Sequence, residues 1–121
     1  MPYLRWVVSI EGICKIMDIA ISINKIPIRL TKERWQHITL GHPEIAGFYY
    51  EILESIEKPD SIYEGKYEEL IATKYFEKLN NKFVVVIYKE LSEEDGFVIT
   101  AYLSNKIQEF VKRKKIWDSQ K

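Results

Sequence analysis

The amino-acid sequence predicts an α+β fold, in which helices and strands occupy separate stretches of the chain. Two segments, residues 3–30 and 61–103, are rich in the β-branched and aromatic residues that favour strands. Between them, residues 31–58 carry apolar side chains at helical spacing. This separation is typical of an antiparallel sheet with its helices packed on one face.

Composition and charge narrow the class of protein. The chain has 121 residues, which fits a single domain over 1–121, and 46% of them are hydrophobic, as in an ordered globular protein. The formal net charge is +0, so binding to nucleic acid or membrane would need a local patch. The single cysteine, Cys14, excludes an internal disulfide framework. Because the sequence shows neither a long apolar span nor a signal peptide, we expect a cytoplasmic protein that binds no membrane.

Residues 1–30 predict an N-terminal β meander. Proline has no N–H to donate, so Pro27 argues that the third strand of this meander is an edge strand. Such an edge can pair with a second chain, which leaves an oligomer open. Three stretches of strand composition are separated by turn residues: 3–10, 13–23 and 26–30.

Residues 31–58 predict two helices. Thr31 is a suitable N-cap for the first, and Gly41 can adopt the left-handed conformation that closes a helix. Pro43 suits the first position of the second helix, which makes His42 its N-cap. Apolar residues then recur at near-helical spacing up to residue 58: Ile45, Phe48, Ile52 and Ile56.

Residues 61–103 predict an antiparallel sheet, followed by a C-terminal helix over 104–117. Asn80 and Asn81 can reverse the chain through left-handed conformations. Ser104 can cap the final helix. The strands expected on composition are 61–65, 69–78, 83–90 and 97–103, and the apolar stripe of the final helix would be Ile107, Phe110 and Val111.

Both histidines of the chain flank the predicted junction between the two helices. His37 and His42 would point about 140° apart on one continuous helix, but a break at Gly41 lets them converge. Imidazoles suit proton transfer near neutral pH. Because their spacing is not that of a helical zinc pair, we expect neither a metal site nor a cofactor. The structural alternative is that His37 is a half-buried helix residue and His42 a cap.

The last predicted strand separates apolar from hydroxyl-bearing side chains. Strict alternation places Val98, Thr100 and Tyr102 on one face, which would be open, and their neighbours on the face toward the helices. Lys74 of a neighbouring strand can join the open face, and a cluster of hydroxyls and lysine can hold a phosphate. Threonine and tyrosine are also good strand formers, so a purely structural role fits the same residues.

A basic run near the C terminus is a second candidate for nucleic-acid binding. Its four consecutive cations can steer RNA or DNA toward the domain. Cations at a helix end also stabilise the helix dipole, which gives the run a structural explanation. The run consists of Lys112, Arg113, Lys114 and Lys115.

Five segments in a fixed order resemble a known nuclease superfamily. In this combination the chain is similar to the barnase/EndoU/colicin/RelE-like (BECR-fold) nucleases, in particular small phage- and toxin-associated members, over roughly residues 28–116. The segments read LTKERWQHI at 30–38, HPE at 42–44, EKPD at 57–60, FVVVIY at 83–88 and FVITAY at 97–102.

The resemblance implies a curved antiparallel sheet and metal-independent cleavage of RNA, in which the ribose 2′-hydroxyl attacks the adjacent phosphate. It implies that His37 and His42 serve as base and acid and that Thr100 and Tyr102 bind the phosphate. It also implies a cognate antitoxin or immunity protein as partner, if the chain is a toxin. Candidates for binding the RNA backbone are Arg34, Lys74 and Lys106, together with Lys112, Arg113, Lys114 and Lys115.

Two other classes of function fit the same residues. A non-catalytic RNA-binding module would use the basic run, bind in a salt-dependent manner and need neither histidine. A protein-interaction domain would use the N-terminal meander as its partner surface.

Overall fold

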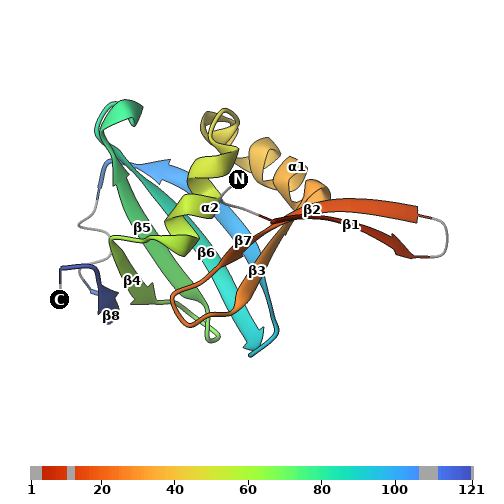
Figure 1. The fold of residues 1–121 in the computed structure, drawn as a ribbon. Helices are drawn as coiled ribbons and strands as arrows, with labels where there is room; N and C mark the ends of the chain where they lie inside the picture. The colour runs from red at the N-terminus through yellow and green to blue at the C-terminus, as the bar shows by residue number, and fades with distance from the viewer. Residues whose placement is uncertain (1–3, 11–12, 107–111, 121) are drawn as a thin grey trace.

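The computed structural model describes residues 4–10, 13–106 and 112–120 and confirms the α+β class (Figure 1). In these ranges, eight strands form one sheet in the order β1-β2-β3-β7-β6-β5-β4-β8. Two α-helices pack on one face of it, as expected. The strands are β1 (Leu4–Ile10), β2 (Ile13–Ile21), β3 (Pro27–Thr31), β4 (Ser61–Glu64), β5 (Leu70–Phe76), β6 (Lys82–Ser92), β7 (Asp95–Ser104) and β8 (Lys115–Asp118). The helices are α1 (Lys32–Gly41) and α2 (Tyr49–Glu57), with 3₁₀ turns η1 (Pro43–Ile45) and η2 (Glu77–Leu79).

The first predicted helix is confirmed, but its end differs from expectation. Thr31 caps α1 by accepting a hydrogen bond of 3.1 Å from the Arg34 backbone N–H. Gly41 belongs to α1 and does not take the left-handed conformation. The helix therefore continues to His42, whose N–H donates to the Ile38 carbonyl at 2.8 Å.

The second predicted helix is divided. Pro43 begins the short turn η1 as a proline at a helix start should, but α2 begins only at Tyr49. Ala46 and Gly47 form a turn between the two pieces, and glycine costs about 1 kcal/mol relative to alanine inside a helix. The division leaves His42 at a short turn rather than at the start of a long helix.

The N-terminal meander is confirmed, whereas the edge position of its third strand is wrong. β1, β2 and β3 pair antiparallel in chain order, and the β1–β2 hairpin projects from the body of the molecule (Figure 1). β3 also pairs with β7, in parallel, through Ile28 with Gly96 and Arg29 with Phe97. Pro27 is tolerated because it is the first residue of β3 and lies outside this parallel ladder. The sheet is therefore mixed, and its described edges are β1 and β8.

The main core lies between the helices and the sheet. Ile38 of α1 and three residues of α2 are almost fully buried against the strands. Burial of an aliphatic side chain of this size contributes about 1.5–3 kcal/mol. The residues of α2 are Ile52, Leu53 and Ile56, and their strand partners include Ile28, Leu30, Ile62, Val84, Val86 and Tyr88.

The opposite face of the sheet is not open, contrary to expectation. Tyr63, Ile71 and Val85 are buried there in a second cluster, and Tyr102 packs against it. Thr73, in register with Val85, is 1% exposed. The hydroxyl-bearing residues of β7 therefore sit at the margin of a packed layer.

A bulge in β7 changes which residues face the helices. Thr100 pairs with Ile87, but Val98 pairs with the next residue, Tyr88, so Ile99 is extra. Strict alternation put Val98 on the face opposite the helices, and this is wrong, because Val98 is buried in the helix-facing core. The alternation is right beyond the bulge, where Ala101 faces the helices and Tyr102 faces away.

The predicted C-terminal helix over 104–117 is wrong throughout its described residues, because Ser104 is the last residue of β7 and residues 105 and 106 are not helical. Residues 107–111, with the predicted apolar stripe, lie outside the described residues. Residues 112–114 are not helical, and Lys115–Asp118 form β8, which pairs antiparallel with β4. At the other predicted reversal, Asn80 and Asn81 have the expected left-handed conformations, with φ of 58° and 60°. Neither α-helix of the described residues is long and apolar enough to cross a bilayer.

Candidate active site

The candidate site lies along an edge of β7 that β3 leaves free. β3 pairs with β7 only as far as Phe97, and beyond it α1 lies beside the strand. The Arg34 guanidinium donates to the Ile99 carbonyl at 3.3 Å, which gives this edge acceptor a partner. From Arg34 to His42 a helix rises about 12 Å, and from Ile99 to Tyr102 a strand rises about 10 Å. Both ends of α1 therefore reach β7.

His42 lies against Tyr102 at the far end of this edge. The centroids of the imidazole and the phenol ring are 5.3 Å apart, and the two planes make an angle of 30°. The His42 side chain is 40% exposed, so a substrate can reach it. His42 stands at the N-cap position of η1, but its imidazole makes no capping hydrogen bond. Its side chain therefore does not play the structural role of a cap.

Glu44 is the functional candidate that the sequence analysis missed. Its Oε2 lies 3.6 Å from Nδ1 of His42, which is too long for a hydrogen bond but close enough for an ion pair with a protonated imidazole. The signal was the His-Pro-Glu spacing, because a tight turn after His42 brings the side chain two residues later back toward the ring.

Thr100 and Tyr102 lie on the same side of β7, as predicted. Two residues apart on a strand, their Cα atoms are about 7 Å apart. Tyr102 packs against the second cluster through its ring, and Thr100 is partly exposed. Arg34, Thr100, Tyr102 and His42 thus line one edge, and they are the predicted site residues that the structure brings together.

His37 lies apart from this group. It is exposed, rather than half-buried, and lines a surface hollow of about 380 Å³ with Thr31, Glu33 and Arg34. On the helical wheel of α1, Arg34 and His42 flank the buried Ile38, whereas His37 points about 140° away from His42. The convergence expected from a helix break at Gly41 does not occur, because Gly41 continues the helix.

Lys74 belongs to the other face of the sheet, so its assignment to the Thr100 face is wrong. Its Nζ donates to the Lys58 carbonyl at the end of α2 at 2.8 Å and lies 3.7 Å from Asp60. Its neighbours across the sheet are Val84 and then Leu103, both on the helix side. The carbonyls at a helix end attract a cation, which accounts for this position.

The other predicted cations lie at the chain's C-terminal end. Lys106 is exposed just beyond β7, and its N–H donates to the Ser104 hydroxyl at 3.1 Å. Lys115 pairs with Asp118 at 2.9 Å, and this hydrogen bond raises the lysine's pKa. The rest of the basic run, Lys112, Arg113 and Lys114, is exposed before β8, which is separated from β7 by β6, β5 and β4.

The described residues contain no group of three or more His, Cys, Asp or Glu side chains that could hold a metal ion. No protein-family model, curated protein or solved structure matches this chain.

Proposed function

We propose that the chain is an endoribonuclease that cleaves RNA without a metal ion. Its reacting groups lie along the edge of β7 that does not pair with β3. The observation that carries the proposal is the contact between the His42 imidazole and the Tyr102 ring, 5.3 Å between centroids. A half-exposed imidazole, a phenol and a carboxylate gathered around one solvent-facing point are groups that acid–base catalysis uses.

The proposed reaction is attack of the ribose 2′-hydroxyl on the adjacent phosphorus. His42 accepts the 2′-hydroxyl proton as the 2′-oxygen–phosphorus bond forms. Tyr102 donates its phenolic proton to the 5′-oxygen as the phosphorus–5′-oxygen bond breaks, which leaves a 2′,3′-cyclic phosphate and a free 5′-hydroxyl. The imidazolium of His42 then releases its proton to water and the Tyr102 phenolate takes a proton from water, so that both groups regain their starting states.

Arg34 and Thr100 are proposed to hold the phosphate during this reaction. A guanidinium suits phosphate oxygens because its N–H groups form a planar fork. Arg34 uses one nitrogen on the Ile99 carbonyl at 3.3 Å, so its remaining N–H groups are held at the edge of β7. The Thr100 hydroxyl adds a neutral donor on the same strand. Such fixed donors stabilise the negative charge that develops on the phosphate.

The test compares the two histidines, which act as matched controls for each other. We expect purified protein to cleave single-stranded RNA in excess chelator and to release 2′,3′-cyclic phosphate ends. His42→Ala should lower the rate by about two to four orders of magnitude, the usual value of a general base. His37→Ala, on the same helix but outside the Tyr102 contact, should lower it less than His42→Ala. Equal cleavage by His42→Ala and the wild type, with both folded, would refute the proposal.

A further inference from the structure

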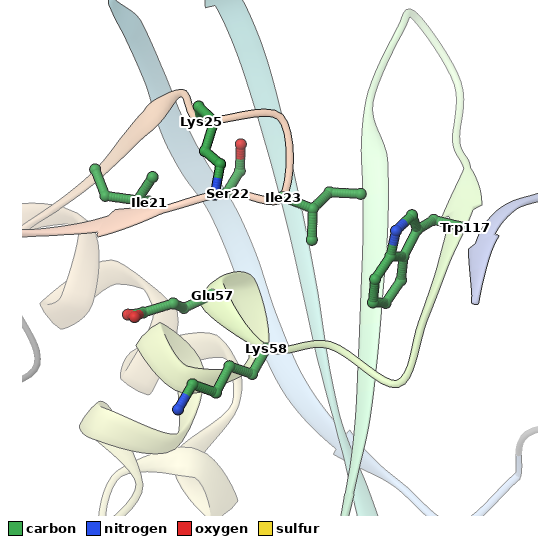
Figure 2. Close-up of a pocket in the computed structure, with 7 residues that line it drawn as sticks. All are labelled: Ile21, Ser22, Ile23, Lys25, Glu57, Lys58 and Trp117. Carbon is green, nitrogen blue, oxygen red and sulfur yellow. The ribbon is translucent and has the colours of Figure 1, made fainter. Parts of the chain in front are cut away.

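A second hollow lies at the C-terminal end of α2 (Figure 2). Its volume is about 440 Å³, and three segments distant in the sequence form it. The turn between β2 and β3 contributes Ile23 and Lys25, the end of α2 contributes Glu57 and Lys58, and β8 contributes Trp117. We call it the Trp117 hollow.

One end of the Trp117 hollow is apolar and aromatic. Trp117 and Ile23 are both partly buried against the main core, and both line the hollow (Figure 2). The turn that carries Ile23 is fixed, because Ser22 and Asn24 donate to the Glu90 carboxylate at 2.7 and 3.0 Å. A preformed apolar surface that includes an indole can bind a flat ring with little loss of conformational entropy.

Two lysines line the Trp117 hollow, and neither has an acidic partner within the described part of the chain. Lys25 and Lys58 are exposed and form no ion pair with any described residue, unlike Lys74, Lys78 and Lys115. Glu57 lies between Lys25 and Lys58, on the side of the hollow away from Trp117 (Figure 2). Negative charge on a ligand is therefore favoured at each lysine and disfavoured beside Glu57.

The basic run of residues 112–115 lies just before Trp117 in the sequence. Lys112, Arg113 and Lys114 are exposed and, like Lys25 and Lys58, form no ion pair within the described part of the chain. Lys114 is three residues before Trp117, which is about 10 Å along a strand. Its carbonyl accepts a 2.8 Å hydrogen bond from the Glu64 N–H, which fixes the run against β4. Cations beside an aromatic ring are the pattern of single-strand nucleic-acid binding.

We propose that the Trp117 hollow binds an unpaired base of single-stranded RNA, stacked on Trp117, with the flanking phosphates on Lys25, Lys58 and the Lys112–Lys114 run. This deepens the proposed function, because it names where the remainder of the same RNA strand binds. The register of the sheet relates the candidate active site to the Trp117 hollow. Tyr102 lies in one cross-strand row with Val85, Thr73, Ser61 and Asp118, and Asp118 follows Trp117 in the sequence. Four strand spacings separate the backbones at the ends of this row, about 19 Å along the sheet, and the RNA must also pass from the face of Tyr102 to the helix-side face of Trp117.

The test measures binding of a ten-nucleotide 2′-O-methyl RNA, which the proposed reaction cannot cleave. Trp117→Ala should weaken binding by about 5- to 150-fold, the range for one stacked base, and Trp117→Phe should retain most of it. Lys25→Gln with Lys58→Gln should reduce the slope of log affinity against log salt by about 1.4. Lys82→Gln, remote from the hollow, is the charge control and should leave affinity and slope unchanged.

Two further measurements separate a binding role from a folding role. In a Trp6→Phe, Trp35→Phe background Trp117 is the single tryptophan, and its fluorescence should be quenched by single-stranded but not by duplex RNA. Unquenched fluorescence, or unchanged affinity and salt slope in the double lysine variant, would overturn the proposal.

The same reagents distinguish this proposal from the nuclease proposal. His42→Ala should bind the oligonucleotide as tightly as the wild type although it no longer cleaves RNA. Binding that depends on Trp117 in a protein that cleaves no RNA would refute the nuclease and support the hollow. Cleavage that is unaffected by Trp117→Ala, with no quenching, would refute the hollow and leave the nuclease standing.

Discussion

The imidazole of His42 and the ring of Tyr102 are in contact although the two residues are 60 positions apart in the sequence. The contact exists because β3 stops pairing with β7 at Phe97 and α1 takes its place along the strand. Had β3 continued to pair, a strand would occupy the position of His42. The geometry of the candidate site therefore follows from a short parallel ladder.

Glu44→Gln should reduce RNA cleavage by about 1.5- to 5-fold. Both partners are partly exposed, 40% for His42 and 44% for Glu44, and exposed ion pairs contribute about 0.2–1 kcal/mol. The effect should shrink as salt rises, because salt screens exposed charges. Cleavage rates at 50 and 500 mM salt check this. Glu93→Gln, on the exposed β6–β7 loop, is the control, and a Glu44→Gln rate equal to it would argue against a role for Glu44.

Tyr88→Phe should leave the free energy of unfolding unchanged or raise it by up to about 2 kcal/mol. The Tyr88 side chain is fully buried and its hydroxyl has no hydrogen-bond partner among the described residues. Burial, with a smaller contribution from the nearby Glu90 charge, raises the pKa of this phenol, so the group stays neutral. An unpaired buried hydroxyl is costly, and phenylalanine fills the same space without it. A loss above about 1 kcal/mol in urea unfolding would show that the hydroxyl has a partner.

The Arg29–Asp95 pair should make stability depend on acid pH. The Arg29 guanidinium donates to Asp95 at 2.9 and 3.1 Å, and this bonding lowers the pKa of the carboxyl. A lowered folded pKa gives stability that is present above the unfolded value, about 3.9, and is lost as pH falls through the folded pKa. Both side chains are more than a third exposed, 38% and 44%, so the pair contributes only about 0.2–1 kcal/mol.

Asp95→Asn isolates that dependence. Its free energy of unfolding should lie below that of the wild type at pH 7 and approach it near pH 2, where Asp95 is protonated in both states. Urea unfolding at the two pH values measures the difference. If Asp95→Asn differs from the wild type by the same free energy of unfolding at pH 7 and at pH 2, the carboxylate charge contributes nothing to stability.

Gly96→Ala should destabilise the fold by about 1–3 kcal/mol, because it overpacks the β3–β7 contact. An added Cβ would lie 2.6 Å from Cδ1 of Ile28 and 2.6 Å from the backbone oxygen of Lys89, and backbone cannot move aside cheaply. Gly41→Ala is the matched control. It meets nothing within 4 Å and stands in α1 without a positive φ, so it should raise stability by about 0.4–1 kcal/mol. Thermal unfolding of both variants checks the contrast, which would fail if both shifted the same way.

Local signals in the sequence predicted the parts of the fold that depend on neighbouring residues. Thr31 caps α1, and Asn80 and Asn81 reverse the chain, because each effect acts within a few residues. Strand composition located β4 to β7 for the same reason. Of the site, the sequence indicated His42, Thr100 and Tyr102, and these three lie on one edge.

What could not be predicted depends on contacts between distant segments. Pro27 suggested an edge strand, but the parallel pairing with β7 involves residues 68 positions away. The bulge at Ile99 depends on the register with β6, which no local pattern encodes. β8 is a strand because it pairs with the edge of β4, although the apolar residues that precede it in the sequence have helical spacing. The face that Lys74 occupies follows from its register with Val84, and the Lys58 carbonyl at the end of α2 then accepts a hydrogen bond from its ammonium.

Because β3 pairs with β7, this part of the sheet can form only after both strands have been synthesised. From Thr31 to Asp95 a ribosome must add 64 residues, which takes about 3–13 s at 5–20 residues per second. Until then α1 can contact only β2 and β3 of the sheet, and His42 cannot meet Tyr102. A nascent or prematurely terminated polypeptide that stops before Tyr102 would therefore lack the complete set of proposed reacting groups.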